Sequence, residues 1–199
     1  MPRKLRIQDE GMIHHVITRG NSQTDVFKTD NDRRKYLNLI LRYKARYFFK
    51  VYAYCLMDNH IHLLIEEGKF SLSKIMQGIQ QSYTQYYNKK YGETGHVFEQ
   101  RYKSIPCSSE AYLERLIAYI HMNPIEAGIA KRVDEYLWSG HNEIAKKTNN
   151  PIIDRRQLYF LIGGEEGKQS YLEIVHNFSN LSQETVKDAY LSAEKIEER

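Results

Sequence analysis

Hydrophobic and polar positions along the chain follow two periods, which predict alternating strands and helices. Runs rich in apolar and β-branched residues predict strands at residues 12–18, 49–57, 60–66 and 96–107. Apolar positions three and four residues apart predict helices at residues 30–46, 71–91 and 109–122. The predicted order along the chain is therefore β-α-β-β-α-β-α.

Polar residues mark the expected ends of these helices. Asp30, Ser71 and Ser109 are placed to cap the three N-termini, because their side chains can accept hydrogen bonds from backbone N–H groups of the first turn. We expect the third helix to end just before Asn123-Pro124, since proline disfavours helical geometry in the residue that precedes it.

The order of elements implies an α+β fold of the ferredoxin-like or RRM-like type. In such a fold a four-stranded antiparallel sheet carries helices on one face and stays open on the other. A linker is predicted at residues 146–151, and helical segments are expected beyond it at residues 155–162, 165–177 and 182–198. We expect two parts, a domain at residues 1–145 and a helical C-terminal extension at residues 146–199.

Length and composition exclude several classes of protein. A chain of 199 residues is long enough to bury a core of its own. No apolar stretch is long enough to span a bilayer, and the segment Met1 to Arg6 lacks the hydrophobic character of a signal peptide. The two cysteines, Cys55 and Cys107, lie far apart and without zinc-site spacing. We therefore expect a cytoplasmic protein with reduced thiols and no membrane partner.

Charge is spread unevenly and favours a polyanionic partner. Residues 1–140 carry 21 Lys and Arg against 15 Asp and Glu, a net charge of +6, whereas residues 141–199 carry 8 against 10, a net charge of −2. A basic body favours nucleic acid, and the 16 tyrosines offer stacking surfaces, although most of them are expected to pack in the core. A basic surface that is merely solvated would give the same counts, so both interpretations stay open.

The strongest functional signal is His60-Ile61-His62 at the start of a predicted strand. Successive side chains of a strand point to opposite faces, so the two histidines share one face and Ile61 lies on the other. Two imidazoles on a rigid strand can bind one divalent metal ion. Two half-buried structural histidines would have the same spacing. The spacing alone therefore does not distinguish a metal-binding pair from a structural pair.

Tyr119 and Asn123 lie four residues apart near the end of the third predicted helix, which places the phenol and the amide on one helical face. A phenol has a pKa of about 10 and is a poor nucleophile at neutral pH, but a metal ion that polarises the electrophile makes its attack possible. The pair suits a metal-dependent site that forms a phosphotyrosine ester. A packed tyrosine and an ordinary helix terminator are the structural alternatives.

Four sequence segments together have the order and spacing of a known family. They are HVITRGN at residues 15–21, MDNHIHLL at residues 57–64, GHVFEQRYK at residues 95–103 and YIHMNPIEAG at residues 119–128. Through them residues 12–140 resemble the REP-associated tyrosine transposases, relatives of the single-tyrosine HUH transposases of bacterial insertion sequences. The part of the chain around residues 153–178 resembles the helical extension of longer members more weakly.

The resemblance implies a metal-dependent endonuclease and strand transferase that acts on single-stranded DNA beside a hairpin. His60 and His62 would be metal ligands, Asn123 a third ligand through its amide oxygen, and Tyr119 the nucleophile that retains a 5′-phosphate. The implied cofactor is Mg²⁺ or Mn²⁺. The implied partner is single-stranded or hairpin DNA, bound by a monomer or a homodimer.

The chain departs from the family pattern at Asp58, where the family usually has proline. We expect the carboxylate to support the turn between two strands, because Asp and Asn are common hairpin residues, rather than to act on the metal from a distance. The assignment of Asn123 is also open, since a residue before proline can be held by backbone geometry as much as by an ion.

Four further polar residues are candidates for DNA contacts. They are Arg19, Asn21, Arg101 and Lys103. The first two follow the first predicted strand, and the last two share one face of the predicted fourth strand, where they suit phosphate contacts. His14 and His15, on the first strand, face opposite sides and are expected to be structural.

Two other functions are compatible with this fold. One is a DNA-binding regulatory protein that keeps the site and no longer cleaves; replacement of Tyr119 by Phe separates the two, because only cleavage needs the phenol. The other is an RRM-like RNA binder that uses aromatic residues on the sheet face. It predicts no metal requirement, and the paired aromatic motifs that it needs are absent from the sequence.

Overall fold

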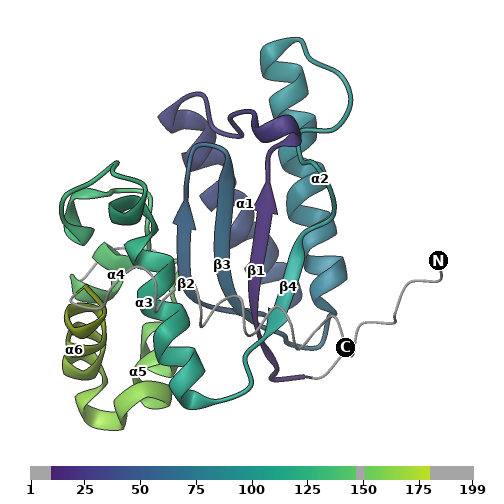
Figure 1. The fold of residues 1–199 in the computed structure, drawn as a ribbon. Coiled ribbons are helices and arrows are strands. Elements are labelled where there is room, and N and C mark those ends of the chain that lie inside the picture. Colours follow the sequence, from purple (N-terminus) through teal and green to yellow (C-terminus); the bar gives the residue numbers. More distant parts are fainter. Residues whose placement is uncertain (1–9, 147–150, 180–199) are drawn as a thin grey trace, which may run out of the picture.

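The structure, a computed structural model, describes residues 10–146 and 151–179 and is built around one four-stranded sheet (Figure 1). Its strands are β1 (Ile13–Arg19), β2 (Lys50–Leu56), β3 (His60–Glu66) and β4 (Lys103–Pro106). They lie in the order β2-β3-β1-β4, and every neighbouring pair is antiparallel. The predicted α+β, ferredoxin-like fold class is confirmed.

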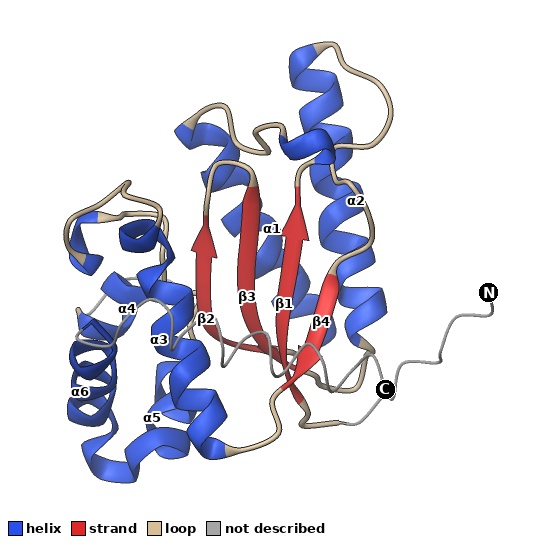
Figure 2. Cartoon of the chain, viewed as in Figure 1, coloured by secondary structure: helices blue, strands red, loops and turns tan. Residues whose placement is uncertain are grey.

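Two long helices, α1 (Asp30–Tyr47) and α2 (Leu72–Tyr91), pack against each other and lie behind the sheet in Figure 1 and Figure 2. Their bounds agree with the predicted helices to within one residue at each end. Ile61, Leu63 and Ile65 of β3 share one strand face and are fully buried. These side chains join the apolar faces of both helices in one hydrophobic core.

The fourth strand is much shorter than the predicted range of residues 96–107, and that prediction was wrong at its N-terminal end. Val97 and Phe98 are adjacent and both buried, which breaks the alternation of a half-exposed strand. The backbone N–H of Asn21 donates to the carbonyl of Val97, and Gly20 pairs with Phe98 in an isolated bridge. This segment therefore continues beyond the end of β1 as a loop, and regular pairing begins only at Lys103.

The third helix, α3 (Glu110–Glu126), does not stop before Asn123-Pro124, so the predicted end was wrong. Pro124 lacks an N–H group and removes one helical hydrogen bond, yet the last turn still closes, because the backbone N–H of Ala127 donates to the carbonyl of Asn123. Asn123 and Pro124 are both buried, and their packing outweighs the local preference. The amide therefore stays on the helix, one turn after the candidate nucleophile.

The chain beyond α3 covers the outer edge of β2. It forms η2 (Val133–Glu135), α4 (His141–Ala145), α5 (Arg155–Gly163), η3 (Gly164–Glu166) and α6 (Gly167–Ser179). The backbone N–H of Leu56 donates to the carbonyl of Trp138, and that of Gly140 donates to the carbonyl of Tyr54, which gives the β2 edge hydrogen-bond partners. The predicted helices at 155–162 and 165–177 are confirmed to within two residues, and the one at 182–198 lies outside the described residues.

A buried polar cluster ties α6 to α3. The Tyr171 hydroxyl lies 2.7 Å from Nδ1 of His141 and 3.1 Å from Nδ1 of His121, and all three side chains are buried. A hydroxyl can donate to one ring and accept from the other, so the three groups satisfy each other at these atoms. The C-terminal helices thereby fix the position of α3.

None of the helices formed by residues 10–146 and 151–179 combines the length and the apolar character that a membrane crossing requires.

A buried carboxylate organises the start of α1. The N-cap position is Thr29, one residue before the predicted cap Asp30, and its backbone N–H donates to Asp32 at 2.8 Å. The fully buried Asp32 side chain also accepts hydrogen bonds of 2.6 to 2.9 Å from three side chains of α2, those of Tyr86, Lys90 and Tyr91. Burial raises the pKa of this carboxyl, but the hydrogen bonds outweigh burial and hold the pKa well below its ordinary value.

We expect Asp32→Asn to lower the free energy of unfolding at pH 7 by about 2 kcal/mol, because it removes charge-assisted hydrogen bonds from a buried cluster. The folded-state pKa lies below the unfolded value, so this contribution is present above about pH 4 and fades as the pH falls further. Urea unfolding at several pH values measures it. Asp30→Asn, in the same helical turn but with a mostly exposed side chain, is the matched control and should change stability little. An equal loss in both variants would contradict the assignment.

Candidate active site

The two histidines of β3 lie on one face of the sheet, as the strand period requires. Their ring centroids are 5.0 Å apart and the rings are nearly perpendicular, at 85°. His60 is half-buried at the start of the strand, and His62 is 3% exposed. The buried aliphatic residues on the opposite face of β3 anchor the strand and hold both rings in place.

A hydrogen bond at Nδ1 orients each imidazole. Nδ1 of His60 lies 2.7 Å from Oδ1 of Asn59, an atom that can only accept, so His60 carries its proton on Nδ1 and has a lone pair on Nε2. Nδ1 of His62 lies 2.9 Å from Nε2 of His15. In both rings Nδ1 is thus engaged in a hydrogen bond within the protein, and Nε2 is the remaining nitrogen.

Burial keeps these rings neutral. The pKa of His60 is lowered to about 4, chiefly by burial and also by the positive charge of Arg19, whereas a hydrogen bond to the Asn123 side chain opposes the shift. Burial also lowers the pKa of His62 well below its ordinary value, and the neighbouring rings and Arg19 add to this effect. Neutral imidazoles offer the lone pair that a metal ion needs.

Helix α3 brings the phenol and the amide to the same place. The Tyr119 ring lies edge-on to His62, with centroids 5.6 Å apart at 88°. Nδ2 of Asn123 donates to the carbonyl of Tyr119 at 2.8 Å. The Asn123 side chain also interacts with His60, a contact that raises the pKa of this ring against the effect of burial. The four side chains therefore converge, and Tyr119 is half-buried rather than sealed in the core.

The donor set fits a divalent metal ion. His60 and His62 offer one imidazole nitrogen each, and Asn123 offers a carbonyl oxygen, while the other end of each group is held by a hydrogen bond. Such a mixed set, with its remaining positions open to water and substrate oxygens, suits Mn²⁺ or Mg²⁺. Among the residues that the structure describes, no three His, Cys, Asp or Glu side chains form a metal cluster, so the amide is essential to this set.

His15 is part of this site, although the sequence led us to expect a purely structural residue. It is fully buried, and besides its hydrogen bond to His62 it contacts the Tyr119 ring, with centroids 6.0 Å apart at 79°. His14 faces the other side of β1, as expected, and lies 3.2 Å from Glu67. The sequence does not contain the register between β1 and β3, which places His15 opposite Leu64 and therefore on the same sheet face as His62.

Two of the four candidate DNA-contact residues lie on the face of the histidines. Arg19 is exposed and pairs with His60 across β1 and β3. Lys103 is exposed and pairs with Ile17, which in turn pairs with His62. The other two are exposed and lie outside the strands, Asn21 on η1 (Asn21–Gln23) beyond the end of β1 and Arg101 in the loop before β4. The predicted alternation of Arg101 with Lys103 on one strand face is wrong, because no strand forms at Arg101.

The Asp58 side chain forms an ion pair with Arg33 of α1. The carbonyl of Asp58 accepts hydrogen bonds from the backbone N–H groups of Val26 and Phe27. Arg33 is 9% exposed and also lies over the rings of Phe27 and Trp138. These contacts favour the expected role of Asp58 in the turn, since its carboxylate is engaged with α1.

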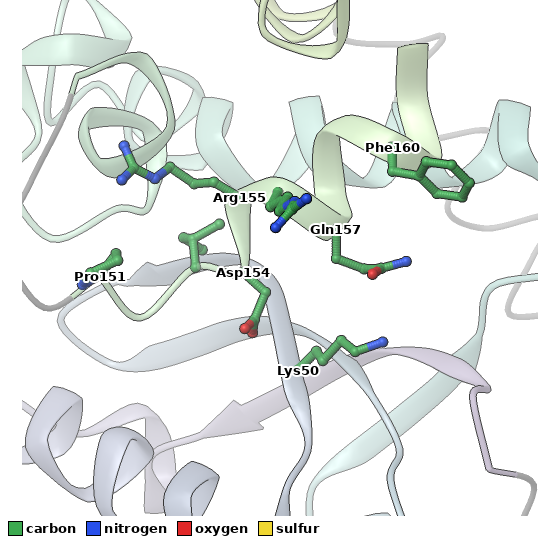
Figure 3. A pocket seen from close by; sticks show the side chains of 8 residues that line it. Lys50, Pro151, Asp154, Arg155, Gln157 and Phe160 are labelled. Carbon is green, nitrogen blue, oxygen red and sulfur yellow. The ribbon is translucent and has the colours of Figure 1, made fainter. Parts of the chain in front are cut away.

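A groove of about 610 Å³ lies between the start of β2 and α5 (Figure 3). Lys50, Arg156 and the exposed ring of Phe160 line it. Lys50 is at the opposite end of β2 from the turn that precedes His60, so the groove does not join the histidines. Lys50 is also paired with Glu66, 2.6 Å away.

The sequence matches the family described as Transposase IS200 like over residues 9–123, more than half of the chain. The chain belongs to this family. No curated protein sequence matches this IS200-like transposase significantly.

Two solved structures are similar to the transposase. A structure of a REP-associated tyrosine transposase bound to a REP hairpin is 17% identical, covers 76% of this chain and 90% of its own, and aligns with a TM-score of 0.63. This likeness shows a shared fold. A candidate transposase from Deinococcus radiodurans R1 is 10% identical and covers 64% of this chain and 98% of its own. Its TM-score is 0.43, too low to support a conclusion.

We expect Asp58→Asn to lower the free energy of unfolding by about 1 kcal/mol, because it removes the ion-pair partner of the buried Arg33. The effect is modest because the Asp58 side chain is itself partly exposed to solvent. The affinity for Mn²⁺ should stay within about two-fold of wild type, measured by isothermal titration calorimetry, since the carboxylate binds α1. A double-mutant cycle with Arg33→Met isolates the pair. A loss of Mn²⁺ affinity of about ten-fold would instead place Asp58 among the groups that act on the ion.

Proposed function

We propose that this transposase is a metal-dependent single-stranded DNA endonuclease and strand transferase with Tyr119 as its nucleophile. The observation that supports it is the convergence of four side chains from two distant segments, β3 and α3. His60, His62, Asn123 and Tyr119 meet on the sheet face opposite the core layer. In each of the three candidate ligands a hydrogen bond holds one nitrogen atom, and the second nitrogen or the amide oxygen is the atom that we propose binds the ion.

In this proposal His60, His62 and Asn123 hold Mg²⁺ or Mn²⁺. The bound ion would supply a Lewis acid that polarises a non-bridging oxygen of the scissile phosphate. The chain contributes neutral imidazoles that need no deprotonation, on a strand that cannot move without disturbing the core. It also contributes the Asn123 amide, which is oriented by its hydrogen bond to the carbonyl of Tyr119.

The hydroxyl oxygen of Tyr119 would attack phosphorus. A bond forms between this oxygen and phosphorus, the bond from phosphorus to the 3′-oxygen breaks, the phenol loses its proton to solvent, and the leaving oxygen gains one. The products are a 5′-phosphotyrosine adduct and a free 3′-hydroxyl. Attack by another 3′-hydroxyl reverses the step and joins strands without ATP, because the ester retains the energy of the broken bond.

The substrate we propose is single-stranded DNA next to a hairpin. The related structure described above holds a REP hairpin, and the basic body of this chain is suited to phosphate backbones. Arg19 on β1 lies beside the histidines, and Lys103 lies on the same face on the next strand, β4. Both can contact phosphates there. Asn21 and Arg101, at the adjoining end of the sheet, are the other two proposed contacts.

The site we propose is complete within a single chain. Tyr119 lies on α3, which packs against β2 and β3 of its own sheet and against α6. Both ligand histidines and the amide come from the same chain. This arrangement supports a protomer that acts on DNA alone, whether or not two copies associate.

We expect Tyr119→Phe to abolish cleavage and leave DNA binding within about two-fold of wild type. The assay incubates single-stranded hairpin oligonucleotides, taken from DNA flanking the gene, with Mn²⁺ and resolves the covalent adduct on a denaturing gel. Loss of the phenol removes the only atom that forms the ester, so the adduct should disappear. Tyr112→Phe, on the same helix, is the matched control and should retain it. Adduct formation by Tyr119→Phe would refute the nucleophile; absence of adduct from wild type would favour the regulatory alternative.

We expect His60→Ala and His62→Ala each to weaken Mn²⁺ binding by at least about ten-fold, because each removes one of three protein ligands. Calorimetric titration in the absence of DNA measures this directly. His96→Ala, at an exposed position of the loop before β4, is the control and should bind as wild type does. Equal affinity in all four proteins would show that the ion, if bound, is held elsewhere.

A further inference from the structure

His15 connects two of the side chains in the proposed site. Its Nε2 lies 2.9 Å from Nδ1 of His62, and the two rings are stacked, with centroids 5.2 Å apart at 21°. Its ring also contacts the Tyr119 ring, to which it is nearly perpendicular, at 79°. His15 is fully buried and His62 is nearly so, which makes this hydrogen bond inaccessible to water.

The direction of this hydrogen bond decides whether His62 can bind a metal ion. A neutral imidazole carries one proton, on Nδ1 or on Nε2. If His62 donates from Nδ1 to His15, its Nε2 has a lone pair and can be a ligand. If His15 donates from Nε2, the His62 proton must be on its own Nε2, and that nitrogen cannot bind a cation. The two buried rings thus have two tautomeric arrangements, of which only one suits the site.

We propose that His15 is a positioning residue that accepts the Nδ1–H of His62, holds His62 in the tautomer whose Nε2 can bind a divalent cation, and packs against the Tyr119 ring. This inference rests on the proposed function in so far as His62 is a metal ligand. Partners of this kind, which bond the far side of a metal-binding imidazole, fix its tautomer and its ring direction. Here the acceptor is a second buried imidazole instead of the more usual carboxylate or backbone carbonyl.

The position of His15 in the sheet supports this role. β1 pairs with β3 along its whole length, and the pairing of Ile17 with His62 and of His15 with Leu64 sets the two imidazoles diagonally on neighbouring strands. Both rings are buried, so the surrounding side chains restrict their rotation. A residue that only filled space here would need no polar atom facing Nδ1 of His62.

The test compares two replacements of His15 that differ in the acceptor atom. His15→Phe keeps a ring of similar shape without any acceptor, and His15→Gln places an amide oxygen near the position of Nε2. We expect His15→Phe to weaken Mn²⁺ binding to the full-length protein by about 10- to 100-fold and His15→Gln to restore most of it. Thermal melting of both variants checks that they remain folded at the temperature of the titration. Equal Mn²⁺ affinity in His15→Phe and wild type would overturn the inference.

A second measurement needs no metal ion. In ¹⁵N-histidine NMR spectra of the metal-free protein, His62 should carry its proton on Nδ1 in the wild type and in His15→Gln, and should lose this preference in His15→Phe. A wild-type His62 protonated on Nε2 would overturn the inference whatever the metal does. If the wild-type protein does not bind Mn²⁺, the proposed metal site is overturned. The NMR spectra would then still show whether His15 determines the tautomer of His62. If the phenylalanine variant does not fold, His15→Met, which also lacks a nitrogen acceptor, replaces it in both measurements.

Discussion

The antiparallel register between β1 and β3 is the constraint on which the whole site depends. His60 lies opposite Arg19 and His62 opposite Ile17, so a shift of one residue would turn both imidazoles into the core layer. The same shift would take Ile61, Leu63 and Ile65 of β3 out of the core that they form with α1 and α2, at a large cost in hydrophobic burial. Core packing and site geometry are therefore controlled by one pairing, and the pairing also brings His15 to His62.

The second half of the site arrives on α3, and the C-terminal helices hold it there. α3 contacts β2 and β3 on one side and α6 on the other, through the cluster around Tyr171. The Asn123 side chain is also held in place, because its NH₂ group donates a hydrogen bond to the carbonyl of Tyr119, one turn earlier in α3. A phenol whose chemistry depends on in-line attack benefits from such a fixed helix, since small displacements of a nucleophile reduce the rate strongly.

Local sequence predicted the elements well where period and end signals agreed. For β3 the alternation of histidine with buried aliphatic residues specified both the strand and its two faces, and α1 and α2 ended within a residue of the predicted bounds. The prediction was wrong where packing outweighs local preference. Pro124 lies inside α3 because that turn is buried, and the segment before β4 leaves strand geometry because Val97 and Phe98 both pack inward.

The sequence by itself determined the fold class, the shared face of His60 and His62, and the family to which the chain belongs, because strand and helix periods and motif spacing are properties of neighbouring residues. Only the tertiary structure decided which side chains from distant segments meet. It placed Tyr119 and Asn123 against the histidines, Asp58 against Arg33, and His15 behind His62. Strand register and helix docking result from burying the whole core at once, and no local pattern contains that information.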